Sequence, residues 1–260
     1  WGDPVFKAND QDLIRRWAAA GPAFLATWDY YEGAGYFVPR FYPALMEDSI
    51  RFLHRNNVRA FYAEGPPIWG FDAPKFWIAS RLLWDSQRDA GDLLKRFCQS
   101  MYGPAAEPMR SFFLRCEEQW MLQFSEAFHR RFFAKPRPAR SSPPAATDAD
   151  PLPTHPEMGR SRWLAFFRHP SQAELFPPAV CDELMGYLEA AERIAARQRH
   201  GRIRERIALT RDAFRFTAAA SGLYHAWKAC ASNPLASADD VRRFENDLAV
   251  FAKRRKTLVK

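Results

Sequence analysis

Hydrophobic residues in the first ninety positions alternate between helical and strand-like spacing. Residues 10–20 carry apolar side chains at helical spacing and begin with Asp10, which predicts a short capped helix. An apolar run without polar alternation follows over residues 23–28 and is typical of a strand covered on both faces. In chain order, the pattern then predicts a helix over residues 44–56, a strand over 58–63 and a helix over 72–84.

Alternation of helix and strand favours an α/β architecture with a parallel sheet and helical crossovers. Glu47 and Asp48 are expected in the first turn of helix 44–56, Asn57 should close that helix in place of glycine, and Asp72 should cap the next helix. No convincing third strand follows, so two strands alone cannot close a barrel.

The rest of the chain has a helical pattern interrupted by one proline-rich stretch. Seven prolines fall within residues 134–156, which reads as an exposed linker or long loop. Long helical patterns follow over residues 178–198, 202–230 and 239–256. We therefore expect an α/β part at 1–88, helices packed on it at 89–133, a linker at 134–156 and an all-α helical bundle at 157–260.

Charge is distributed unevenly along the chain. Residues 1–128 hold 14 Lys and Arg against 16 Asp and Glu, whereas residues 129–260 hold 24 against 14. The basic second half could bind an acidic polymer, or it could form a helical face that is exposed to water. Sparse aromatic residues among the arginines between Arg193 and Arg215 argue against nucleic acid, so docking of this basic face on the acidic first half is favoured.

Several classes of protein are excluded by motif and composition. No apolar run approaches the roughly 18 residues of a membrane span, and no targeting signal is visible in the residues that follow Trp1. The four cysteines show no CxxC spacing and the six histidines no paired ligand spacing, so neither a metal site nor a cofactor is expected. Buried free thiols are the default, with a disulfide as the alternative in an oxidising compartment.

Clustered motifs between residues 24 and 115 resemble the bacterial domain of unknown function 4838 family. The segments that carry the resemblance are Trp28-Asp29-Tyr30-Tyr31, Glu47-Asp48 with Arg51-Phe52, Val58-Arg59 before Glu64-Gly65, Ala79-Ser80-Arg81-Leu82-Leu83-Trp84-Asp85, and Tyr102-Gly103-Pro104-Ala105-Ala106. Two features depart from the family pattern: Asn57 stands where glycine is common, and the proline-rich stretch looks like an insertion.

The resemblance implies the closing part of a glycoside-hydrolase-like TIM-type (β/α)8 barrel, followed by helices. Residues 24–28 would form its seventh strand, residues 58–63 its eighth, and helix 72–84 its last helix. The upstream barrel strands would then belong to the same polypeptide, before Trp1. Resemblance also implies a periplasmic or extracellular location and a carbohydrate substrate.

Two carboxylates end the predicted strands and are the candidate catalytic residues. Glycoside hydrolysis needs two carboxyl groups flanking the scissile bond, one as acid and one as base or nucleophile. Asp29 and Glu64 occupy equivalent strand ends, and neighbouring strands lie about 4.8 Å apart, so both could reach one sugar ring. The alternative is that each caps a loop or pairs with Arg40 or Arg59, with the true acid on an earlier strand.

Aromatic residues are dense around these carboxylates and suit stacking on sugar rings. The candidate substrate-binding residues are Trp28, Tyr30, Tyr31, Glu32 and Trp69, with Glu32 as a loop ligand; the alternative for each aromatic ring is core packing. The sequence thus predicts a carbohydrate-active, glycoside hydrolase-like protein. The competing hypothesis is a non-catalytic carbohydrate-binding or interaction module on a degenerate barrel. A raised pKa on one carboxyl group beside an ionised partner would favour the enzyme.

Overall fold

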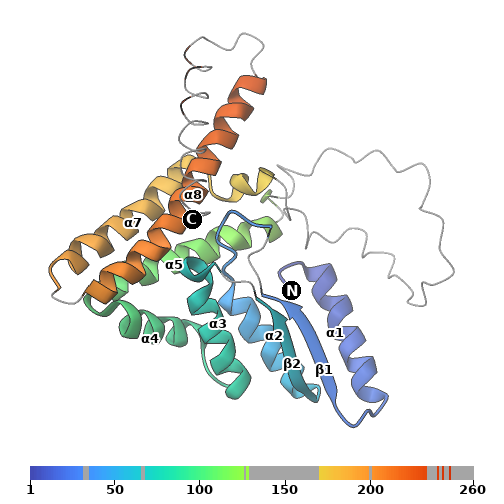
Figure 1. The fold of residues 1–260 in the computed structure, drawn as a ribbon. Helices are drawn as coiled ribbons and strands as arrows, with labels where there is room; N and C mark the ends of the chain where they lie inside the picture. The colour runs from blue at the N-terminus through green and yellow to red at the C-terminus, as the bar shows by residue number, and fades with distance from the viewer. Residues whose placement is uncertain are drawn as a thin grey trace.

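The computed structural model of the chain describes residues 1–31, 35–65, 68–125, 127–128, 170–198 and 201–232, with the single positions 239, 242 and 246. Helices dominate, and one small sheet lies near the N-terminus (Figure 1). The elements are α1 (Pro4–Ala19), β1 (Leu25–Tyr30), α2 (Pro43–Arg55), β2 (Val58–Glu64), α3 (Trp69–Trp84), α4 (Ala90–Tyr102), α5 (Ala106–Met121), α7 (Pro178–Ala196) and α8 (Gly201–Ser232). Short 3-10 helices occur at η1 (Gly103–Ala105), η2 (Leu122–Phe124) and η4 (Pro170–Leu175).

The two strands are parallel and are joined by α2, as the alternation of patterns predicts. Trp28 is in register with Tyr62, and Tyr30 with Glu64. Burial alternates along β1, so Thr27 and Asp29 lie on a partly covered face while Trp28 and Tyr30 lie on an exposed one. We call these the covered face and the open face of the sheet. The α/β and helical fold class is thus confirmed, whereas the described residues contain two strands and not a barrel.

Helix boundaries differ from the sequence prediction at the N-termini. Helix α1 begins at Pro4 and is capped by Asp3, whose side chain accepts from the Phe6 N–H at 2.9 Å, so Asp10 lies inside the helix and does not cap it. Helix α2 begins at Pro43, which moves both Glu47 and Asp48 beyond the first turn. Proline at the first helical position explains both early starts, because its fixed φ and missing N–H suit that position.

The connection between α2 and β2 follows the prediction for Asn57. This residue has a φ of 60°, in the left-handed region that asparagine tolerates better than most residues. Helix α3 begins at Trp69, three residues earlier than expected. Asp72 therefore lies inside the helix, where its carboxylate accepts from the Ile68 N–H at 2.9 Å.

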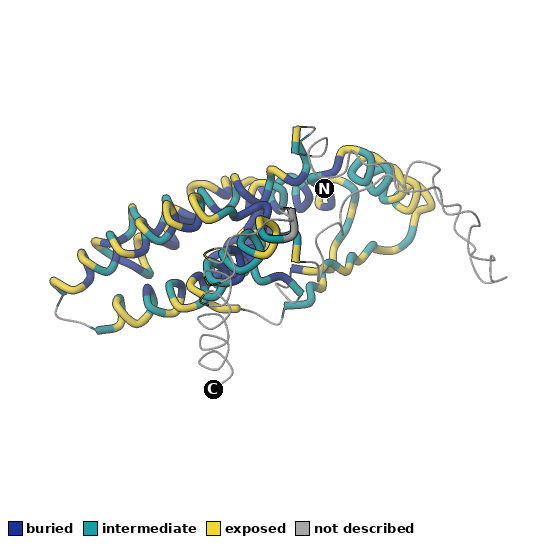
Figure 2. Tube along the Cα trace, turned by 90° about the horizontal axis from the view of Figure 1, so that it is seen from above, coloured by how far each residue is buried: buried dark blue, intermediate teal, exposed yellow. Residues whose placement is uncertain are grey.

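One hydrophobic core joins the two halves of the described chain. It runs from Tyr31 and Met46 through Phe112 in α5 to Leu184 in α7 and Phe214 in α8. Figure 2 shows buried positions gathered on the inner sides of the packed helices. The C-terminal helices therefore share their core with α3, α4 and α5.

Two predicted segments fall largely outside the described residues. The proline-rich stretch 134–156 lies entirely outside them. Of the predicted helix 239–256, only positions 239, 242 and 246 are described, and all three are helical.

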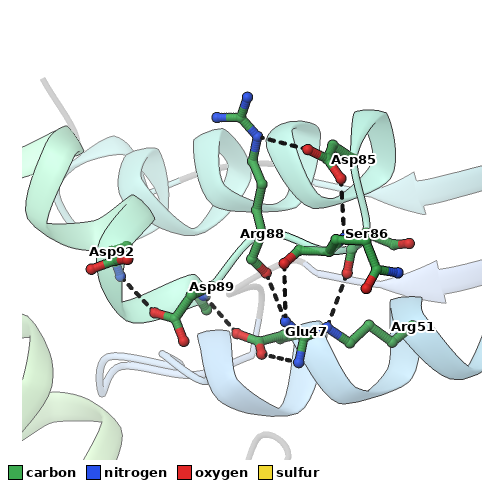
Figure 3. A network of polar contacts seen from close by, with 9 residues as sticks. Glu47, Arg51, Asp85, Ser86, Arg88, Asp89 and Asp92 are labelled. Carbon is green, nitrogen blue, oxygen red and sulfur yellow. Dashed lines mark hydrogen bonds and ion pairs between the residues drawn. The ribbon is translucent and has the colours of Figure 1, made fainter.

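A polar network fixes the turn between α3 and α4 against α2 (Figure 3). The Arg51 guanidinium donates to the backbone oxygens of Ser86 at 2.9 Å and Arg88 at 3.0 Å. Glu47 pairs with Arg51 and accepts from the Ala90 N–H at 2.6 Å. Because these partners are backbone groups and an ion pair within the scaffold, the network explains the Glu47 and Arg51 motif without any role in catalysis.

Replacing Arg51 by methionine should lower the free energy of unfolding by about 1.5–3 kcal/mol, since charged hydrogen bonds to a turn are lost while the aliphatic stem is kept. The matched control is Arg16→Met, which breaks an exposed pair with Asp12 and should change stability by less than about 0.5 kcal/mol. Urea denaturation of both variants measures the difference. Equal effects of the two replacements would contradict this role of Arg51.

Candidate functional site

A pocket of about 290 Å³ lies at the carboxyl end of β1, bordered by α1, α2 and the end of α5. Its size is near the lower end of small-molecule sites. Polar groups and aromatic rings share its walls, and the residues used below are Asp10, Asp29, Tyr31, Arg40, Tyr42 and Trp120. Such a lining suits a ligand that is polar at its edges and apolar on its faces.

Asp29 extends into this pocket from the covered face of β1. Burial raises the pKa of its carboxyl group. Two effects oppose this rise: the Tyr30 N–H donates to Asp29 Oδ1 at 2.7 Å, and the positive charge of Arg40 favours the carboxylate. A carboxyl group that keeps its proton to higher pH is the type of group that acts as a general acid. Asp29 is thus the predicted site residue with the strongest local support.

A second carboxyl group, Asp10, borders the same pocket and was missed as a site residue in the sequence. It comes from the interior of α1 and accepts a hydrogen bond from the Trp1 indole N–H. After burial, which is the largest cause, the negative charge of Asp10 also raises the pKa of Asp29. The signal that could have identified it is spacing: Gly2, Phe6 and Asp10 recur every four residues and all border the pocket.

Arg40 supplies the positive charge of the pocket. Its Nη1 donates to the Tyr30 backbone oxygen at 2.6 Å. Its guanidinium carbon lies 5.0 Å from the Tyr42 ring centre and 5.9 Å from that of Trp120, within the range of cation–π attraction. The predicted alternative, an ion pair between Arg40 and Asp29, is not among the salt bridges of the described residues, although the two charges interact at longer range.

Two buried tyrosines form the wall beneath Asp29. The Tyr31 ring packs against Tyr42 with ring centres 6.3 Å apart, and burial raises the pKa of both phenols, so both remain protonated at neutral pH. The Tyr31 hydroxyl is buried near Ser49 without a hydrogen bond of ordinary geometry to the described residues. The Tyr42 hydroxyl donates to the Tyr30 backbone oxygen at 3.4 Å, which leaves the Tyr31 hydroxyl as the candidate donor to an oxygen of a bound ligand.

The two predicted catalytic carboxylates are not brought together. Glu64 is in register with Tyr30, and Asp29 with Ala63, so the side chains of Asp29 and Glu64 leave the sheet on opposite faces. Glu64 does not border the pocket. Adjacent strand ends are close in space, but a one-residue offset in register places their side chains on opposite faces.

The predicted sugar-binding residues fall in three places. Trp28 and Tyr30 lie on the open face with 62% and 48% of their surface exposed, and both also border the pocket. Tyr31 is buried in the pocket wall, whereas Trp69 is exposed at the start of α3 and does not border the pocket. Glu32 lies outside the described residues.

The cysteines and the basic residues considered in the sequence belong to the scaffold of the fold. All four cysteines are free thiols; Cys98, Cys116 and Cys181 are buried, as expected, whereas Cys230 is only half-buried. The described residues contain no group of ligands that could hold a metal ion and no helix long and apolar enough to cross a membrane. In the basic region, Arg211 pairs with Glu192, and Arg206 donates to the Met101 backbone oxygen at 2.9 Å.

Comparison with known proteins gives one family. Residues 2–115 match the family described as "Domain of unknown function (DUF4838)", which confirms the resemblance seen in the sequence. No curated protein and no solved structure shows significant similarity to the chain.

Proposed function

Residues 2–115 belong to the DUF4838 family of domains of unknown function, and from the pocket at the carboxyl end of β1 we propose that the protein is carbohydrate-active and hydrolyses a glycosidic bond. The proposal rests on two carboxyl groups, Asp29 and Asp10, that border one pocket with aromatic walls. Burial raises the pKa of the Asp29 carboxyl group. Two such groups are the minimum for glycoside hydrolysis.

Each carboxyl group has a role that follows from its surroundings. Asp29 is the proton donor to the leaving oxygen, because its partly buried position favours the protonated form. Asp10, oriented by the Trp1 indole, is the second carboxyl group, acting as base or nucleophile. Glu64 does not border this pocket, so we leave it out of the proposed pair.

Aromatic rings supply the apolar contacts that the face of a sugar requires. Tyr31 and Trp120 border the pocket, whereas the Trp28 and Tyr30 rings lie on the open face of the sheet as candidates for contact with a further part of the substrate. Arg40 adds a fixed donor near the ring oxygens or a substituent. Trp69 is exposed at the start of α3 and is a candidate for contact with a more distant sugar, and Glu32 keeps its predicted role as a loop ligand.

The small sheet fits the end of a TIM-type barrel. Each strand has one hydrogen-bonded neighbour among the described residues, and the open face carries exposed Trp28, Tyr30 and Tyr62. Upstream barrel strands of the same polypeptide would pair with the sheet edge and cover this face. A periplasmic or extracellular location belongs to the same proposal.

A non-catalytic carbohydrate-binding module is the second candidate. It is favoured by the exposed Trp28 and Tyr62 rings, whose centres lie 4.8 Å apart in an edge-to-face arrangement on the open face. Exposed rings on a sheet stack on sugars without any acid or base. Activity measurements separate the two candidates.

The test uses the full natural chain with a panel of aryl-glycosides and uronic-acid oligosaccharides. For an accepted substrate, Asp10→Asn should lower kcat about 10²- to 10⁴-fold, because it removes the second carboxyl group without changing its shape. Glu64→Gln is the matched control: it neutralises a strand-end carboxylate on the opposite face and should leave kcat unchanged.

Three results would change the conclusion. Loss of activity in Glu64→Gln with retention in Asp10→Asn would restore the pair of strand-end carboxylates. Binding without turnover on every substrate would favour the non-catalytic module. The absence of both binding and turnover on every substrate would refute the carbohydrate function.

A further inference from the structure

The segment 35–42, which we call the site loop, carries Arg40 and Tyr42 into the pocket. It is held by residues more than 130 positions away in the sequence. Gln172 in η4 is 1% exposed, and its Oε1 accepts from the backbone N–H groups of Phe37 at 2.7 Å and Val38 at 3.4 Å. Its Nε2 donates to the Gly35 backbone oxygen at 3.3 Å. One buried amide therefore contacts three residues of the site loop.

A second long-range contact comes from α8. Thr217 is fully buried, and its hydroxyl donates to the Phe37 backbone oxygen. The N–H and the C=O of Phe37 are thus both bonded to side chains of the C-terminal helices. A buried peptide group that has lost water needs such partners, so this residue of the site loop depends on η4 and α8.

The far end of the site loop is fixed by α3 and β1. The Lys75 ammonium donates to the Arg40 backbone oxygen at 2.9 Å, and the Arg40 guanidinium donates to the Tyr30 backbone oxygen. Arg40 is therefore at the end of a short segment that is held at both ends. Weakening the contacts of Phe37 would leave the site loop held firmly at its Arg40 end only, which gives the guanidinium more freedom to move in the pocket.

We propose that Gln172 and Thr217 are positioning residues for the pocket: through the site loop they set where the Arg40 guanidinium lies relative to Asp29. Both lie beyond residues 2–115, so the segment that carries Arg40 into the pocket is held by the C-terminal helices and not by the matched domain alone. The effect on sugar binding rests on the proposed function, whereas the effect on Arg40 and Asp29 does not.

The chain contains a matched control for Thr217. Thr210 lies seven residues earlier in α8, is also buried, and its hydroxyl donates at 3.0 Å to the backbone oxygen of Gly70 in α3, which does not border the pocket. Thr210→Val and Thr217→Val remove the same hydroxyl from the same helix and leave one backbone oxygen without its donor. Only Thr217 is bonded to the site loop.

The experiment measures the pKa of Asp29 by NMR titration of its carboxyl carbon, together with sugar affinity, in the full chain. Arg40 holds the Asp29 pKa down, so Thr217→Val should raise that pKa further, whereas Thr210→Val should leave it at the wild-type value. Sugar affinity should fall about three- to tenfold in Thr217→Val only, the size expected when a displaced Arg40 loses one hydrogen bond to the sugar. Thr217→Ser, which restores the donor, should return both values to those of the wild type.

The outcomes separate the two proposals. Equal changes in Thr217→Val and Thr210→Val, or no change in either, would refute the positioning role. A selective change of the Asp29 pKa in a protein that binds no sugar would support the positioning role and refute the proposed function. Gln172→Met, which keeps the volume and removes the acceptor, supplies the same test from η4 if Thr217→Val does not fold.

Discussion

Replacing Lys75 by methionine is expected to lower the free energy of unfolding by about 3–5 kcal/mol, because it leaves the carboxylate of Asp72 buried without its counter-ion. The two side chains are 0% and 2% exposed, and Lys75 Nζ lies 2.8 Å from Asp72 Oδ1. Methionine matches the volume of the lysine stem, so packing is largely kept. Urea denaturation at neutral pH measures the loss.

Removing both charges together is expected to recover most of this stability. In Asp72→Asn combined with Lys75→Met, the amide oxygen can still accept from the Ile68 N–H, and no charge remains buried. Replacing a buried ion pair by neutral groups is often nearly neutral or stabilising. A single Lys75→Met variant as stable as the double variant would contradict the importance of the pair.

The pH dependence of stability provides an independent check of the same residue. Burial lowers the pKa of Lys75 from 10.5 to about 8, against the attraction of Asp72. The unfolded chain therefore binds more protons than the folded chain between these values, so stability rises with pH across that window as the cost of keeping a buried ammonium charged disappears. The double variant should show no such rise in stability. Denaturation of the wild type and the double variant at pH 7 and at about pH 9.5 measures the difference.

The positions of the helices and strands could be predicted from the sequence because they depend on local patterns. Parallel strands at Leu25–Tyr30 and Val58–Glu64 follow from short apolar runs between amphipathic helices, and the left-handed Asn57 follows from the tolerance of asparagine for positive φ. The family resemblance used the same local motifs. Several of them, such as Glu47 with Arg51, prove to hold the scaffold together and do not contact the pocket.

The composition of the pocket could not be predicted in the same way because it depends on register and on distant contacts. Asp29 and Glu64 are equivalent along the chain, yet the offset between β1 and β2 places them on opposite faces. Asp10 was interpreted as a helix cap, and only the true start of α1 at Pro4 shows that it faces the pocket. Contacts of Gln172 with the site loop span more than 130 residues and leave no local signal.

Asp29→Asn is expected to abolish most of the activity. For a substrate that the protein hydrolyses, kcat should fall about 10²- to 10⁴-fold, because the amide keeps the shape of the side chain but cannot donate an acidic proton. Asp12→Asn is a matched control on the exposed side of α1, where the carboxylate pairs with Arg16, and should leave kcat unchanged. A fully active Asp29→Asn variant would remove Asp29 from the mechanism.

The same replacement is expected to stabilise the protein at neutral pH. Burial raises the pKa of Asp29 above its ordinary value of 3.8, so the folded protein holds this proton to higher pH than the unfolded chain does. Wild-type stability therefore falls as pH rises from 3.8 through the raised pKa, because a charge must then be kept partly buried. The variant has no such charge and still accepts from the Tyr30 N–H.

Thermal denaturation of the wild type and Asp29→Asn across pH 3 to 8 tests this directly. The variant should melt higher at pH 7, and the difference should shrink as the pH falls toward the ordinary value of 3.8, where both folded and unfolded wild-type chains carry the proton. Stabilisation together with loss of activity is the combination expected of a group that is unfavourable for folding and needed for function. Destabilisation at pH 7 would instead assign Asp29 a structural role.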